Sequence, residues 1–304
     1  MSSEPSDLSP RDVFAEVAAA VPTELHPHIV IIGSLAAAYA FMDRRRGTAM
    51  RTKDVDCVLA PHLTAVEHGQ LITKRLLAAG WRPRRAGEFG RPADAQTPDD
   101  QLPAVRLFPP GNDDWFLEML TEPASDAQRG RRWDRLALES GEHFGLPSFE
   151  FTGISTFDPA TSREGLRYAR PECMALAHLL EHREFSDQPI SGTDFGGRPQ
   201  LRRNKDLGRV LAIATLAGRE DLHQWPSHWN DTLVARLPER RQELATTAGD
   251  GIRMLLTSED DLREALQHVN KGLLAHDPAS LNDLRATGEG VVRLAIHPLE
   301  QSAV

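Results

Sequence analysis

Two short apolar runs near the start of the chain have the pattern of buried β-strands. Residues 29–32 read Ile-Val-Ile-Ile, and residues 55–59 read Val-Asp-Cys-Val-Leu. Between the two runs, a Gly33–Ser34 turn precedes an apolar stretch that favours a helix over 35–42. A second helix is expected from residue 62 to a C-cap at Gly80. A succession of strand, helix, strand and helix is typical of an α/β layer.

The later pattern divides the chain near residue 170. Before it, alternation and apolar runs predict four further strands, over 104–108, 115–120, 149–154 and 165–168. After it, Pro171 at a first helical turn opens an amphipathic helix, and helical periods continue to residue 286. A segment at 291–296 is expected to be a strand or a closing segment. We therefore expect a mixed α/β sheet with flanking helices over residues 1–169, followed by a mostly helical domain over residues 170–304.

Composition places the chain among soluble globular proteins. Of its 304 residues, 40% are hydrophobic and 26% are charged, which is enough apolar material for one large or two ordinary domains. No apolar run reaches the eighteen or so residues that span a bilayer, and the N-terminal segment has no apolar signal core. A cytoplasmic protein without a membrane partner is expected. Cys57 and Cys173 are expected to be reduced thiols in the core.

The net charge of −9 argues against an extensive nucleic-acid-binding surface, because phosphate contacts need clustered Lys and Arg. Local basic clusters nevertheless occur, and most are expected to be solvated faces and helix ends. They are Arg44-Arg45-Arg46, then Arg82 with Arg84 and Arg85, then Arg129 with Arg131 and Arg132, and Arg202-Arg203.

The candidate chemistry lies at the start of the second strand. Side chains alternate along a strand, so Asp54 and Asp56 project to one side while Val55 and Cys57 project to the other. Two neighbouring carboxylates repel each other, and Mg²⁺ is a cation that relieves this repulsion through one or two carboxylates, water and substrate phosphates. The Gly33–Ser34 turn adds a close backbone approach and a helix N-terminus that suit an anion.

Glu118 is the one charge in the otherwise apolar run 115–120. A buried carboxylate without a partner is costly, so its position needs an explanation. Either Glu118 faces the same side as Asp54 and Asp56 and completes a metal site, or it lies on an edge strand and faces water. Asp113 and Asp114 are the fallback candidates for a third carboxylate.

The Gly33–Ser34 turn followed by Asp54-Val55-Asp56 resembles the nucleotidyltransferase superfamily. The resemblance implies a nucleotidyltransferase-like mixed sheet, a third carboxylate on a later strand, two Mg²⁺ ions and a nucleoside triphosphate donor such as ATP. Asp54, Asp56 and Glu118 would then be the catalytic metal ligands, and Gly33 and Ser34 would contact the nucleotide. The alternative is a helix start and an acidic strand entry whose charges are merely solvated.

A motif in the helical half narrows the resemblance. Arg203, Lys205 and Asp206, after a Gly/Pro/Ser-rich loop, match the Arg-x-Lys-Asp of AbiEii-like toxin-type nucleotidyltransferases. The resemblance implies that they bind the triphosphate; the alternative is a helix N-terminus with exposed charges. Two departures stand out. Arg209 replaces an Asp of the family, and His178 or His182 lies where the family has a Lys, so His178 is the expected nucleotide contact.

The resemblance implies transfer of a nucleoside monophosphate from a nucleoside triphosphate to an acceptor hydroxyl. A tRNA end or another RNA is the acceptor that the toxin group suggests, with an antitoxin protein as partner. A protein hydroxyl or a small molecule of the aminoglycoside type stays open as acceptor. A non-catalytic nucleotide-binding or regulatory module on the same fold is the competing hypothesis.

Overall fold

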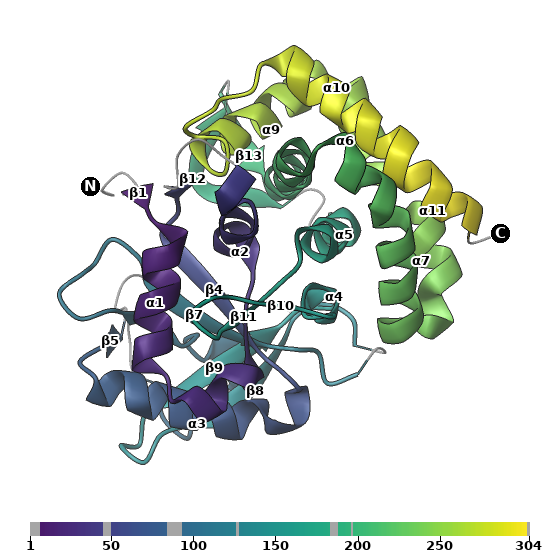
Figure 1. Ribbon diagram of the computed structural model, residues 1–304. Helices are drawn as coiled ribbons and strands as arrows, with labels where there is room; N and C mark the ends of the chain where they lie inside the picture. The colour runs from purple at the N-terminus through teal and green to yellow at the C-terminus, as the bar shows by residue number, and fades with distance from the viewer. Residues whose placement is uncertain are drawn as a thin grey trace. The chain divides into compact units, whose positions relative to one another are not determined.

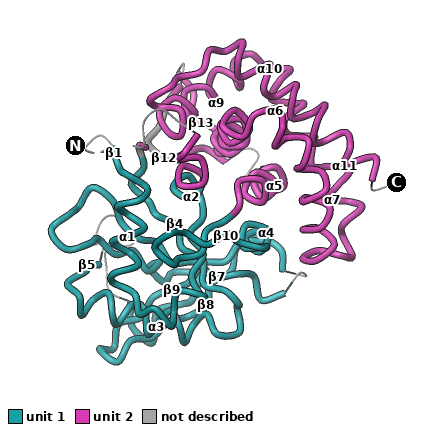
Figure 2. Tube along the Cα trace, viewed as in Figure 1, with its two compact units in different colours: residues 1–36, 52–169 teal, residues 37–51, 170–304 magenta. Residues whose placement is uncertain are grey.

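The computed structural model describes residues 7–44, 50–83, 93–125, 128–182, 188–195 and 197–302, with only the backbone at 51 and 191–194 (Figure 1). Its contacts divide into two compact units (Figure 2). The first unit contains residues 1–36 and 52–169, and the second contains 37–51 and 170–304. The division after residue 169 is also the one expected from the sequence, whereas segment 37–51 was expected in the first domain.

The first unit is built on a mixed sheet, as the sequence predicts. Within the described residues this sheet has seven strands, in the order β10, β11, β2, β4, β7, β6 and β5. The pairs β11–β2 and β4–β7 are parallel, and the other pairs are antiparallel. The strand bounds are β2 Ile29–Ile31, β4 Asp54–Leu59, β5 Arg82–Pro83, β6 Arg106–Phe108, β7 Phe116–Thr121, β10 Ala160–Thr161 and β11 Arg167–Tyr168.

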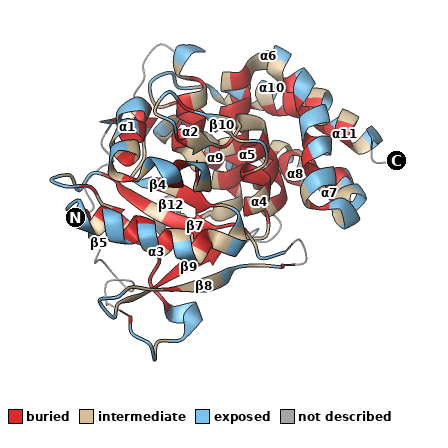
Figure 3. Cartoon of the chain, turned by 60° about the horizontal axis from the view of Figure 1, so that its bottom comes forward, coloured by how far each residue is buried: buried red, intermediate tan, exposed pale blue. Residues whose placement is uncertain are grey.

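One face of this sheet is covered by helix α3 (His62–Ala78), which exposes its outer side (Figures 1 and 3). The Thr73 hydroxyl of α3 lies 3.7 Å from the Met119 sulfur on β7. Gly69 of α3 comes so close to β4 that a Cβ there would lie 3.0 Å from a Leu59 methyl carbon. Because successive strand residues alternate, side chains one position away from Met119 and Leu59 lie on the opposite face.

The other helices of the first unit are short. Helix α1 (Pro10–Ala20) begins at Ser9, whose hydroxyl accepts a hydrogen bond from the Asp12 amide at 3.4 Å. Pro10 suits the first helical position because its missing N–H has no intrahelical partner there. Helix α2 follows β2 directly and continues into the second unit. The bounds of the other helices are α2 Gly33–Ala40, α4 Thr152–Ser155, and the 3-10 helices η1 Thr23–His28 and η4 Asp99–Gln101.

The predicted strand over 149–154 is wrong, because Thr152–Ser155 is helical. The strands of this region are instead β8 (Arg132–Ala137) and β9 (His143–Ser148), which form an antiparallel hairpin. The sequence did not reveal β8 because it is rich in charge. Asp134 is paired with His62 of α3 at 3.0 Å, and Arg135 with Asp99 of η4 at 2.8 Å. These ion pairs with residues distant in sequence offset the cost of placing charged side chains in the strand.

The second unit is largely helical, as expected. Its longest helix, α6, bends at Gly218, where φ is +76°. Trp225 and Trp229 of α6 are buried, and the Trp229 indole donates a hydrogen bond to the carbonyl of Glu172 on α5 at 2.8 Å. The helices are η2 Met42–Arg44, α5 Pro171–Glu181, α6 Arg202–Arg236, η5 Pro238–Arg240, α7 Arg241–Thr247, α8 Asp250–Thr257, α9 Glu259–Lys271, α10 Leu281–Val291, the π-helix η6 Val292–Ile296 and α11 His297–Ser302.

For the second unit, the loop expected before α6 and the strand alternative for 291–296 are wrong. The Gly/Pro/Ser-rich segment before α6 contains a hairpin of strands β12 (Pro189–Phe195) and β13 (Arg198–Leu201), which turns at Gly197 with φ +82°. The stretch 291–296 is helical rather than extended. The reason is a helical spacing of buried residues that continues beyond the short apolar run. These buried residues are Val291, Ala295, Ile296 and Leu299.

Two further expectations concern the core and the membrane. Cys57 and Cys173 are both buried, as expected of core thiols. In the part of the chain that the structure describes, no helix combines the length and the apolar character needed to cross a bilayer.

Candidate metal centre

Three acidic side chains of the first unit share one face of the sheet because of the register of two parallel strands. Along β4 and β7, Asp54 pairs with Phe116 and Asp56 pairs with Glu118. Register partners in a sheet project to the same face, and residues two apart along a strand share a face. Asp54, Asp56 and Glu118 therefore project to the same face of the sheet, opposite α3, as the sequence predicts. Because β7 lies between β4 and β6, the alternative of an edge-strand Glu does not apply, and the metal site stays a prediction.

Gly33 lies against the Asp56 carboxylate. The Ile32 amide donates to the Asp56 carbonyl at 2.9 Å, which draws the end of β2 onto β4. At Gly33 the chain turns with φ +74° and enters α2, whose first turn contains Ser34. A Cβ at Gly33 would lie 2.9 Å from an Asp56 carboxylate oxygen, closer than real Cβ atoms approach. The backbone angle therefore favours glycine, and an added Cβ would have to displace the Asp56 carboxylate.

The Glu118 carboxylate has a side-chain partner that neither alternative from the sequence included. Arg106 is its register partner on β6, and its guanidinium donates to both Glu118 oxygens, at 2.8 Å and 3.1 Å. The two side chains are only 25% and 13% exposed. Arg106 was not among the site residues expected from the sequence. The sequence did contain a signal for it. Residues 104–108 alternate like a strand, Arg106 is their one charged position, and the next predicted strand contains Glu118.

Asp54 is exposed at the start of β4 and Asp56 is half-buried. The Thr52 hydroxyl lies 3.1 Å from a carboxylate oxygen of Asp54. Among the described residues, no three His, Cys, Asp or Glu side chains are gathered closely enough to hold a metal ion. Asp54 and Asp56 by themselves still fit Mg²⁺, which commonly uses one or two carboxylates and completes its octahedron with water and substrate phosphates. They would be its protein ligands.

Neighbouring acidic and thiol groups do not add to this site. Asp113, a fallback candidate, pairs with Arg82 at 2.6 Å and precedes β7. Asp114 also precedes β7, in a turn closed by its amide and Asn112. On the α3 face, burial and the charge of Asp56 raise the pKa of the Cys57 thiol. Cys57 therefore stays protonated at neutral pH and is not a thiolate ligand.

The predicted nucleotide-binding motif lies in the second unit, at the start of α6. Asp206 is buried, with its carboxylate 3.3 Å from Arg209 and 3.7 Å from Arg202. Arg203 lies 3.6 Å from Asp261 of α9, and Lys205 is half-buried. Arg209, the departure from the family pattern, is thus a direct partner of the motif carboxylate. The motif is part of a charge network within this unit, and its binding to a triphosphate stays a prediction.

Other members of this network come from β13 and α9. Arg198 donates to Asp261 at 2.8 Å and lies 3.2 Å from Glu264. The buried Asn204 amide donates to Asp261 at 3.1 Å. On α5, the His178 ring nitrogen lies 3.3 Å from Glu181 of the same helix. The expected contact of His178 with a nucleotide also stays a prediction.

Most described arginines of the basic clusters have local partners. Arg44 pairs with Asp221, and Arg129 lies 3.7 Å from Glu150. The Arg131 guanidinium stacks 3.9 Å from the centre of the Trp133 ring. These contacts agree with the interpretation of the clusters as solvated faces. Four members of the predicted clusters lie outside the described residues: Arg45, Arg46, Arg84 and Arg85.

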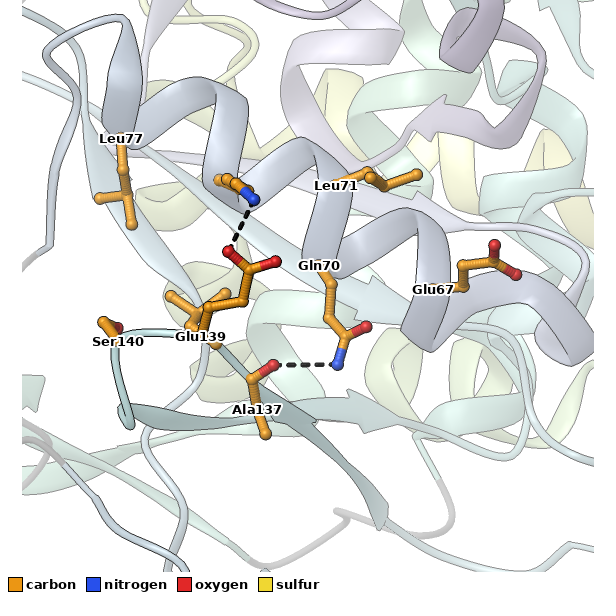
Figure 4. Close-up of a pocket in the computed structure, with 9 residues that line it drawn as sticks. Glu67, Gln70, Leu71, Leu77, Ala137, Glu139 and Ser140 are labelled. Atoms are coloured by element: carbon orange, nitrogen blue, oxygen red, sulfur yellow. Dashed lines mark hydrogen bonds and ion pairs between the residues drawn. The ribbon is translucent and has the colours of Figure 1, made fainter.

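A pocket of about 440 Å³ lies between α3 and the turn that joins β8 to β9 (Figure 4). Two pairs of its lining residues are bonded to each other. Lys74 pairs with Glu139 at 2.8 Å, and the Gln70 amide donates to the Ala137 carbonyl at 2.9 Å. The carboxylates of the metal centre are not part of its lining, and it lies on the α3 side of the sheet.

A scan against protein-family models, a search of curated proteins and a search of solved structures gave no significant match to this chain. Any functional assignment therefore has to come from the geometry of the site and from the sequence pattern.

Gly33→Ala should destabilise the first unit more than Gly111→Ala does. Gly111 has nearly the same φ, +72°, but a Cβ there would meet nothing within 4 Å. Both variants bear a left-handed backbone penalty of about 1–2 kcal/mol, and only Gly33→Ala also displaces the Asp56 carboxylate. Chemical denaturation measures both losses of unfolding free energy, and Mg²⁺ titration should show weaker binding only in Gly33→Ala. Equal losses with unchanged Mg²⁺ affinity would contradict the proposed contact.

His268→Leu should make the protein less sensitive to acid. Burial, followed by the charges of Lys205, Arg209 and Lys271, lowers the pKa of His268 to about 4. Among the described residues, its buried Nε2 atom has no hydrogen-bond partner. The unfolded histidine takes up a proton below about pH 6.5, so stability should be lost as the pH falls from about 6.5 toward 4.

Urea unfolding at pH 7 and pH 4.5 measures this loss. We expect His268→Leu to recover about 1–2 kcal/mol of it, allowing for partial exposure of the ring. His223→Gln is the control, because His223 is exposed on α6. A pH dependence that is the same in wild type and His268→Leu would show that His268 does not cause the loss.

Proposed function

We propose that this chain is a Mg²⁺-dependent nucleotidyltransferase that transfers a nucleoside monophosphate from a nucleoside triphosphate to an acceptor hydroxyl. The observation that supports the proposal most is the β4–β7 register, which aligns Asp56 with Glu118 two residues after Asp54. The contact between Gly33 and Asp56 adds to it, because it sets the start of α2 beside the carboxylates. Carboxylates beside a helix N-terminus suit a cation and a phosphate tail together.

The reaction would be an in-line displacement. The acceptor oxygen bonds to the α-phosphorus, the bond from that phosphorus to the pyrophosphate oxygen breaks, the hydroxyl proton passes to water, and pyrophosphate leaves. Bound Mg²⁺ would neutralise the phosphate charge and help to orient the reacting oxygens. Asp54 and Asp56 would hold the ion, and Gly33 and Ser34 would admit phosphate oxygens at the start of α2. Positioning and charge neutralisation supply most of the rate.

RNA, in particular a tRNA end, is the acceptor we propose to test first, with an antitoxin protein as the partner class implied by the sequence motif. Several described arginines of the basic clusters already contact carboxylates or an aromatic ring of this chain. Fewer of them are therefore available to bind the phosphates of a nucleic acid than the sequence suggested. A small cationic acceptor of the aminoglycoside type is therefore the alternative substrate for the same chemistry.

One observation favours a second candidate function, a nucleotide-binding or regulatory module that does not transfer the nucleotide. Both oxygens of Glu118 accept hydrogen bonds from Arg106. A carboxylate held in this way is less available to an acceptor hydroxyl or a metal ion. Under this hypothesis the chain binds Mg-ATP, and no label moves from the triphosphate to another molecule.

Asp56→Asn should reduce nucleotidyl transfer by about a hundredfold or more, the order of loss seen when one group that stabilises a transition state is removed. The assay incubates the full chain with α-labelled nucleoside triphosphates, Mg²⁺ and total RNA, and in parallel with aminoglycosides. Asp113→Asn is the matched control, because Asp113 is 69% exposed and paired with Arg82 in the same unit. It should keep wild-type transfer.

Calorimetric titration of Mg-ATP separates the two candidate functions. Label in RNA or in the small molecule, lost in Asp56→Asn, supports the transferase. Binding of Mg-ATP without any transfer supports the module. Full transfer by Asp56→Asn would remove the metal site from the proposal.

A further inference from the structure

A row of three charged side chains crosses the strands on the acidic face of the sheet. Arg106 on β6 is the register partner of Glu118 on β7, and Glu118 is the register partner of Asp56 on β4. The row therefore runs from one cation to two adjacent anions. Register neighbours in a sheet have Cβ atoms about 5 Å apart, so each charge acts strongly on the next.

The Arg106 guanidinium occupies both carboxylate oxygens of Glu118, which a second metal ion would need as ligands. The guanidinium fork binds both carboxylate oxygens, at 2.8 Å and 3.1 Å, and neither side chain is more than 25% exposed. Arg106 also packs against Phe116, with its guanidinium carbon 5.9 Å from the ring centre. A planar fork held by two bonds and a ring contact is not readily displaced. A divalent ion on Glu118 would have to displace or face this fixed cation.

We propose that Arg106 takes the place of a second Mg²⁺ and that the site holds a single divalent cation, on Asp54 and Asp56. Arg106 is then a positioning residue that holds Glu118 and supplies a permanent positive charge. This inference rests on the proposed function and departs from the two ions that the sequence resemblance implied.

The test counts Mn²⁺ ions bound to the full-length chain, by electron paramagnetic resonance of the free ion during a titration. Wild type should bind one Mn²⁺ per chain at the site, and Arg106→Met should bind two, because Glu118 is then available as a ligand. Arg106→Lys keeps the charge and should return the number to one. Arg82→Met is the control, since it breaks an exposed ion pair on β5 of the same sheet, and it should also bind one.

Two Mn²⁺ ions in wild type, or one in a folded Arg106→Met, would overturn the proposal. Circular dichroism shows whether Arg106→Met is folded, and if it is not, the wild-type number and the Arg106→Lys number still decide. No bound Mn²⁺ in wild type would overturn this inference together with the metal site of the proposed function. One Mn²⁺ without nucleotidyl transfer would support the single-ion site and remove only the proposed activity.

Discussion

The parallel pairing of β4 with β7 is the constraint on which the acidic site depends. Six consecutive residue pairs join the two strands, from Asp54 with Phe116 to Leu59 with Thr121. A slip of one residue would turn every side chain of one strand to the other face. It would place Asp56 against α3 and expose Cys57, so the apolar contacts of α3 and the position of the carboxylates are fixed by the same register.

This register also creates an electrostatic problem within the sheet. Asp56 and Glu118 are brought side by side in a setting where neither is fully exposed, and like charges this close raise each other's energy. The Arg106 guanidinium on the neighbouring strand β6 offsets part of this repulsion by pairing with Glu118. In the proposed function, a divalent cation on Asp54 and Asp56 would neutralise more of this repulsion. The repulsion between these neighbouring carboxylates therefore underlies both the Arg106–Glu118 pair and the proposed binding of a metal ion.

The charged motif of the second unit, Arg203, Lys205 and Asp206, lies within a network of ion pairs. Its acidic and basic residues come from α6, α9 and β13, and they pair mainly with one another. Buried members such as Asn204 and Asp206 stabilise this unit through hydrogen bonds whose loss would be costly. The same residue types that suggest phosphate binding in the sequence thus have a structural role, and a functional one would have to be additional to it.

The sequence by itself determined the strands around Asp54 and Glu118, the helical second half and the shared side of Asp54 and Asp56, because these follow from local periodicity. Only the tertiary structure decided how distant charges pair. Asp134 with His62 makes β8 possible, and Arg106 with Glu118 changes what the acidic row can bind. Such pairs join residues on different elements, and no periodicity along one segment records which strand or helix will lie beside it.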